Sequence, residues 1–165
     1  MGFVISIPAF GEPSSLAKKL FIPSTCFTTR NTSFNFSSIS AHPLSAVKPA
    51  LPHGLGLAML LPAVVKHIYH AVPEVLAEIY QPIVSDLKGV PSEAEKAAVG
   101  IERWLFTIGV TEKLEDAGFT KNDIPKLVKL AKEMPSLDLL LNMAPVEPTE
   151  KVIEAIYRDS MKPLS

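Results

Sequence analysis

Two histidines, His42 and His53, are the residues of this chain that are best suited to chemistry. Imidazole nitrogens bind Fe(II) and Zn(II), and they exchange protons near neutral pH. His53 lies between Pro52 and Gly54, directly before an uncharged apolar run. By its residue type His53 is a candidate metal ligand, and the alternative is that it only begins a helix and bonds a backbone group there.

The other two histidines, His67 and His70, are three positions apart in the chain. On a helix this spacing places two imidazoles on one face, where they could hold a metal. We expect instead a solvated or partly packed face, because no third ligand lies near them in sequence. A further hypothesis joins all four histidines in one metal site, which requires them to converge in space.

The elements that must position these residues are predicted to be helices. The predicted helices all follow residue 50, where the sequence has helix caps, prolines, glycines and apolar stripes. A capping box of Ser92 and Glu95 starts the third helix, and Thr149 is the N-cap of the last helix. The predicted helical ranges are 53–71, 73–87, 92–108, 120–134 and 149 onward, with a short turn of helix over 111–117. Their apolar stripes are Ile124, Leu127, Val128, Ala131 and Met134, and Val152, Ile153, Ile156 and Tyr157. The fold class is therefore mainly α, an irregular helical bundle.

Single side chains of these helices also have an expected environment. Trp104 and Phe106 are predicted to lie in the core, and Lys126, Lys129 and Lys132 to form a solvated face.

Composition narrows the class of protein. The chain has 165 residues, 47% of them hydrophobic, which is enough for a globular core. A net charge of −1 argues against a nucleic acid partner, and the apolar run from 54 to 65 is too short to span a membrane. Cys26 is the only cysteine, so no intramolecular disulfide forms and a reducing, cytoplasmic compartment is expected.

The first 50 residues differ from the rest. They hold six of the eight phenylalanines and only one acidic residue, Glu12. We predict an irregular Ser/Thr/Phe-rich segment over 1–50, disordered or with a short strand at 3–7, joined to a helical domain over 51–165. A transit peptide is the alternative for this acid-poor segment.

The segment Pro52-His53-Gly54-Leu55-Gly56-Leu57-Ala58-Met59-Leu60-Leu61-Pro62 resembles the PHG-x-A-x-A-x-x-LP element of the iron-dependent (group III) alcohol dehydrogenases. Ala41-His42-Pro43-Leu44 resembles the family's second histidine element. Weaker similarities follow in the family's order, at 118–127 and 142–157. The resemblance covers roughly His42 to Met161 and implies the all-helical, metal-binding half of a two-domain parent.

The resemblance also implies a reaction. In the family a divalent metal, Fe(II) or Zn(II), polarises an alcohol oxygen, and NAD(P) takes the hydride. His53 matches a metal ligand, and His42 matches a histidine near the metal that is assigned to proton relay or substrate orientation. The implied substrates are small alcohols and aldehydes.

The chain departs from the family pattern at several positions. Ser38 stands where another ligand histidine is expected, and the upstream Asp and His ligands are absent, because the first Asp is Asp86. The Gly-rich phosphate-binding element is absent too, so no cofactor-binding residue is assigned. We expect the chain alone to be inactive and to need a cofactor-domain partner or a homo-oligomer. The alternative is a non-catalytic helical remnant or interaction module.

Overall fold

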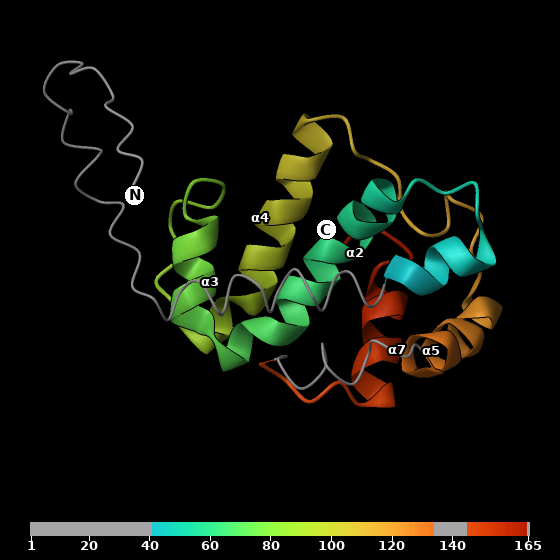
Figure 1. Cartoon of the computed structure of the whole chain (residues 1–165). Coiled ribbons are helices and arrows are strands. Elements are labelled where there is room, and N and C mark those ends of the chain that lie inside the picture. The colour runs from blue at the N-terminus through green and yellow to red at the C-terminus, as the bar shows by residue number, and fades with distance from the viewer. Residues whose placement is uncertain (1–40, 134–144, 165) are drawn as a thin grey trace, which may run out of the picture.

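The computed structural model describes residues 41–133 and 145–164, and these form helices and loops without a strand (Figure 1). Residues 41–47 are helical. The elements that follow are α2 (His53–Ile68), η2 (Tyr69–Ala71), α3 (Pro73–Tyr80), η3 (Pro91–Glu93), α4 (Ala94–Thr107), η4 (Lys121–Asp123), α5 (Ile124–Glu133) and α7 (Glu150–Asp159). The prediction of a mainly α bundle is confirmed. The strand predicted at 3–7 lies outside the described residues.

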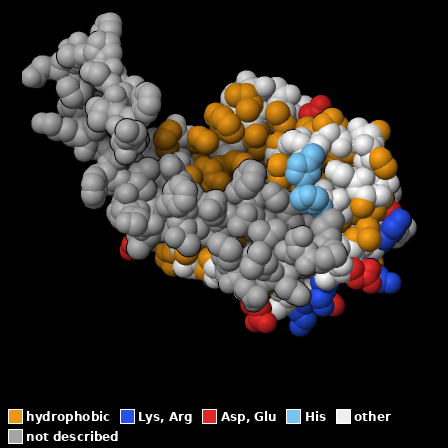
Figure 2. Space-filling view, viewed as in Figure 1, with side chains coloured by type: hydrophobic (Ala, Val, Ile, Leu, Met, Phe, Trp, Pro, Cys, Tyr) orange, Lys and Arg blue, Asp and Glu red, His pale blue; other side chains and the backbone are white. Residues whose placement is uncertain are grey.

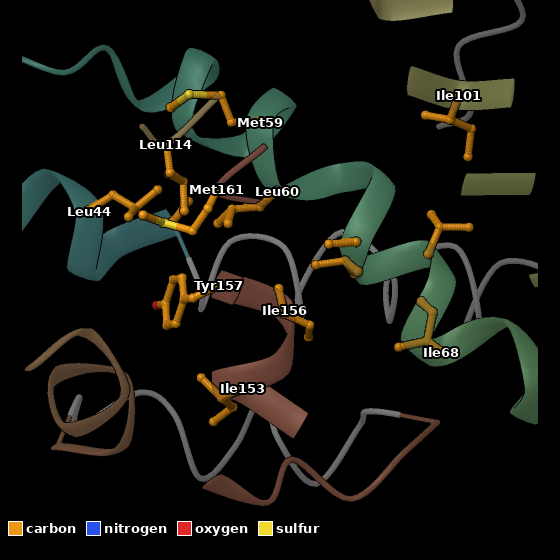
Figure 3. Close-up of a cluster of buried hydrophobic side chains, with 14 of the residues drawn as sticks. Leu44, Met59, Leu60, Ile68, Ile101, Leu114, Ile153, Ile156, Tyr157 and Met161 are labelled. Carbon is orange, nitrogen blue, oxygen red and sulfur yellow. The ribbon is translucent and has the colours of Figure 1, made fainter. Parts of the chain in front are cut away.

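Helix α2 is the centre of the core. It packs against both α4 and α7, and Figure 3 shows its side chains Met59, Leu60 and Ile68 in one cluster with Ile156 of α7 and Ile101 of α4. Each such buried side chain contributes about 1.5–3 kcal/mol relative to exposure. The motif that carries His53 thus forms the N-terminal part of α2, and His53 itself lies in the first turn of this helix.

Helices α5 and α7 each bury one stripe, as their sequences predict. Ile124, Leu127 and Ala131 are buried on α5, and Ile153, Ile156 and Tyr157 on α7; Val128 and Val152 are partly buried, and Met134 lies outside the described residues. The predicted lysine face of α5 is exposed. Thr149 is the N-cap of α7, since its hydroxyl accepts the N–H of Val152 at 3.4 Å.

The second predicted helix is shorter than expected, because α3 ends at Tyr80 rather than near Leu87. Pro82 explains the early end: it has no N–H to donate, and its ring would collide with the carbonyl four residues before it. The chain turns instead, and the N–H groups of Ile83 and Val84 both donate to the Tyr80 carbonyl at 2.9 and 2.8 Å.

The predicted capping box of Ser92 and Glu95 is wrong. The carboxylate that holds this helix start belongs to Glu93, which accepts the N–H groups of Lys88 at 2.8 Å and Val90 at 3.3 Å. Glu95 instead forms an ion pair with Lys66 of α2 at 3.0 Å. The two carboxyls are two residues apart, so sequence spacing alone did not distinguish them.

The core position predicted for Trp104 is also wrong, since this side chain is 39% exposed, while Phe106 is partly buried. Both lie in the last turn of α4, where the helix leaves the core and only part of its surface is covered.

The loop after α4 forms a single helical turn, in which the Ala117 N–H donates to the Lys113 carbonyl at 3.0 Å. Gly118 stops it with φ +77°, a conformation that favours glycine. Backbone bonds from Leu114 to Ser160 and from Glu115 to Met161, at 3.1 and 3.3 Å, fix this turn to the end of α7. We call residues 113–119 the anchored turn.

Candidate functional site

His42 and His53 lie together at the surface. Their ring centroids are 4.8 Å apart, and the ring planes are tilted by 56°. Both residues are exposed, and Figure 2 shows histidine side chains on the same face as a large hydrophobic area. The two histidines singled out in the sequence therefore form one pair in space.

Two helical segments bring the pair together. His42 belongs to helical residues 41–47, and His53 is the first residue of α2. Ala41 and Leu44 are fully buried, so the first helix is held by the core while His42 faces outward. Leu44 also lies against Gly56 of α2, where an added Cβ would be 3.5 Å from the Leu44 side chain.

The pair alone does not complete a metal site. Structural and catalytic zinc sites use three or four protein ligands, and within residues 41–133 and 145–164 no group of three His, Cys, Asp or Glu side chains could hold an ion. Ser38 lies outside the described residues. The described part of the chain thus offers two adjacent imidazoles but not a full ligand set.

The other histidines have separate surroundings. His67 Nε2 is 3.1 Å from the Asp159 carboxylate of α7, so this ring is partly packed in an inter-helix contact, and His70 is exposed on η2. His53 is the first residue of α2 and His67 the last but one, and a rise of ~1.5 Å per residue separates them by about 21 Å. The hypothesis of one site with four histidines is wrong.

Charged groups also gather between α2, α4 and α7. The Lys66 ammonium is 3.0 Å from Glu95 and 3.3 Å from Asp159. Burial alone would lower the pKa of Lys66, but hydrogen bonding to Glu95 and the charge of Asp159 raise the pKa above its ordinary value. Every base here has a carboxylate partner, which indicates a structural link between helices.

Sequence reasoning missed one residue next to the histidine pair. Lys48 donates from Nζ to the Ala117 carbonyl at 2.7 Å and lies 4.7 Å from the centre of the Phe119 ring. Its partners are about 70 residues further along the chain, so no local pattern indicates the contact. The only sequence feature that pointed to Lys48 was its positive charge in a segment with a single acidic residue.

No helix in the described part of the chain combines the length and the apolar character needed to cross a membrane. The long apolar stretch at the start of α2 is instead a core element.

A family model described as "Fe-containing alcohol dehydrogenase family, C-terminal" matches residues 31–161. The long-chain primary alcohol dehydrogenase AdhA of Thermoanaerobacter ethanolicus is 65% identical over 119 residues, which are 72% of this chain and 30% of that protein. The 1,3-propanediol dehydrogenase of Klebsiella pneumoniae is 30% identical over 132 residues, 79% of this chain and 33% of that protein.

Solved structures of alcohol dehydrogenases and of a 1,3-propanediol oxidoreductase also match the fold of this chain. The crystal structure of a 1,3-propanediol oxidoreductase matches with a TM-score of 0.64 at 29% identity, over 76% of this chain and 32% of that one. The structure of the archaeal Red Sea brine pool alcohol dehydrogenase ADH/D1 matches with a TM-score of 0.62 at 20% identity, over 75% and 32%, and supports the fold alone. The chain spans about a third of the length of the proteins it matches.

Proposed function

The chain belongs to the Fe-containing alcohol dehydrogenase family, and on that premise we propose that it is the metal-binding helical part of an NAD(P)-linked dehydrogenase of alcohols and aldehydes. The observation that carries the proposal is the exposed pair of His42 and His53, with ring centroids 4.8 Å apart. The two relatives from Thermoanaerobacter ethanolicus and Klebsiella pneumoniae are alcohol dehydrogenases by description, which supports the reaction class.

We assign His53 as a ligand of the divalent metal and His42 as a proton relay or substrate-orienting group. When bound, the metal would act as a Lewis acid on the alcohol oxygen. An exposed imidazole nitrogen of His53 can bind the ion directly, and His42 lies close enough to exchange a proton with a group held there. The described residues supply only part of the coordination shell, so further ligands and the nicotinamide site would lie outside residues 41–133 and 145–164.

The first test is calorimetric titration of the metal-free chain with Zn(II), beside the variants His53→Ala and His70→Ala. We expect the His53→Ala change to abolish binding, because it removes the assigned ligand. His70 is exposed on η2, and His70→Ala is the matched control that should bind as the original chain does. If no form of the chain binds Zn(II), or if both variants bind equally, the assignment of His53 fails.

A second test concerns turnover. The chain alone, supplied with NAD(P)⁺, Fe(II) and primary alcohols, should give no change in absorbance at the NAD(P)H band, because about two thirds of the length of its relatives is not covered. Steady oxidation of an alcohol by this chain alone would contradict the need for a partner.

The second candidate function is a non-catalytic helical module. It is favoured by the lack of a three-ligand group among the described residues and by two large apolar side chains at the end of α4, Trp104 and Ile108, that are exposed. Absence of binding in the Zn(II) titration would favour this function over the first.

A further inference from the structure

The geometry points to Lys48 as the positioning residue of the histidine pair: its ammonium fastens the loop between His42 and His53 to the anchored turn. The inference rests on the proposed function only where it assigns the histidine pair to metal binding, because the contacts of Lys48 themselves involve no metal. Lys48 directly follows the helical residues that carry His42, and His53 begins α2 five residues later (Figure 1).

The backbone of Lys48 is fixed on the histidine side. Its N–H donates to the Leu44 carbonyl at 2.8 Å and ends the first helix, and its carbonyl accepts the Leu51 N–H at 3.0 Å. These two bonds fold the short loop so that His42 and His53 end on the same side. A movement of Lys48 therefore changes the position of the helical residues that carry His42 relative to the start of α2.

The side chain of Lys48 is fixed on the other side. Nζ donates to the Ala117 carbonyl at 2.7 Å and lies over the face of Phe119, which is 2% exposed. The Lys48 ammonium is partly shielded from water. It is stabilised instead by its hydrogen bond to the carbonyl and by its attraction to the face of the aromatic ring. The anchored turn is itself bonded to the end of α7, so it gives Lys48 a rigid base.

Gly118 makes room for this contact. A Cβ at this position would lie 2.6 Å from Lys48 Nζ, which is closer than real Cβ atoms approach. The atom it meets is the far end of a flexible side chain, so the substitution would displace the ammonium rather than the backbone. Gly118→Ala is therefore a second way to release Lys48 without changing Lys48 itself.

Gly109 provides the matched control. Its φ of +89° resembles the +77° of Gly118, but an added Cβ there meets nothing within 4 Å. Gly109→Ala and Gly118→Ala thus share the backbone cost of a positive φ, and only the second displaces Lys48. The difference between them isolates the lysine contact.

The experiment measures the pair directly in the metal-free chain. NMR cross-relaxation between the ring protons of His42 and His53 should be clear in the original chain and in Gly109→Ala. It should be reduced at least twofold in Lys48→Met and Gly118→Ala, and Lys48→Arg should restore it, because a guanidinium also donates to a carbonyl and stacks on a ring. Lys126→Met, on an exposed face of α5, should change nothing.

A Zn(II) titration of the same variants separates this inference from the proposed function. Groups that orient metal ligands without touching the metal typically affect affinity 10–100-fold, and we expect a loss of about tenfold in Lys48→Met and Gly118→Ala. If the original chain binds no Zn(II), the proposed function fails while the ring contact still decides the role of Lys48. If Lys48→Met does not fold, Gly118→Ala against Gly109→Ala decides it. Unchanged ring contacts in the folded variants would overturn the inference.

Discussion

The Glu102 and Lys113 side chains form a buried ion pair, with 0% and 4% of their side chains exposed. Glu102 also accepts the Leu164 N–H at 2.9 Å, and the Lys113 ammonium lies 5.4 Å from the centre of the Phe106 ring. Two charges removed from water are tolerable only when each satisfies the other. The pair therefore ties α4, the anchored turn and residue 164 to one another.

Replacing Lys113 by Met should lower the free energy of unfolding by about 3–5 kcal/mol, because it leaves the Glu102 carboxylate buried without its cation. Urea unfolding followed by circular dichroism measures this change. Adding Glu102→Gln to the same chain should recover part of the loss. Lys162→Met removes an exposed ion pair with Glu115 at 3.6 Å and should cost below about 1 kcal/mol; equal losses in the two single variants would contradict the argument.

The sequence indicated individual site residues where a short motif contains them. His42 and His53 are eleven positions apart, so their motif could be seen in the sequence, and the structure places their rings together; their roles remain a proposal. Lys48 and Lys113 were not identified, because their partners Ala117 and Glu102 lie 69 and 11 positions away in the chain and only the fold brings them together.

At the scale of elements, two helical glycines have opposite surroundings. Gly100 of α4 lies against Val84, and a Cβ there would collide with the Val84 side chain, while Gly54 of α2 has nothing within 4 Å of that position. The loop after α3 therefore approaches α4 more closely than any side chain at residue 100 would allow.

Gly100→Ala should destabilise the chain by about 1–3 kcal/mol, because forced overpacking exceeds the gain in helix propensity. Gly54→Ala should stabilise it by roughly 0.5–1 kcal/mol, because alanine loses less backbone entropy in a helix and meets no neighbour. Thermal unfolding of both variants tests whether Gly100→Ala lowers the stability and Gly54→Ala raises it. A stabilising Gly100→Ala would show that Val84 moves aside without cost.

Element boundaries followed from the sequence where one residue decides them alone. Thr149 caps α7, and the stripe of Ile124, Leu127 and Ala131 is buried, as local spacing predicts. The predicted end of the second helix was wrong, because Pro82 stops α3 although the sequence around it has a helical pattern. The predicted cap of the third helix was wrong too, because Glu93 and not Glu95 accepts the backbone N–H groups there. The boundary near residue 50 stays a prediction, although helical residues 41–47 contribute Ala41 and Leu44 to the core.

At the scale of the whole molecule, three large apolar side chains are exposed among the described residues, Val90, Trp104 and Ile108, and two of them lie close together in the chain. Trp104 is 39% and Ile108 55% exposed, both at the end of α4. The hydrophobic area in Figure 2 lies on the same face as histidine side chains. Large apolar patches on a protein surface are associated with binding to other proteins or with aggregation.

The isolated chain should self-associate, and Trp104→Glu should reduce the average mass measured by light scattering at equal concentration. The reason is that a charge at this exposed position opposes burial in a contact. Gln81→Glu adds the same charge at an exposed position directly after α3 and should leave the mass unchanged. A monomeric original chain, or equal masses in both variants, would contradict this prediction.

The single core around α2 has a consequence for inheritance. The ring contact of His42 with His53 and the contacts of Lys48 join residues between 41 and 161, and these residues share one core of apolar side chains. A region with its own core can be copied, fused or separated from neighbouring sequence and still fold. In evolutionary terms, the residues that form this core can pass through a gene rearrangement with the geometry of the histidine pair intact.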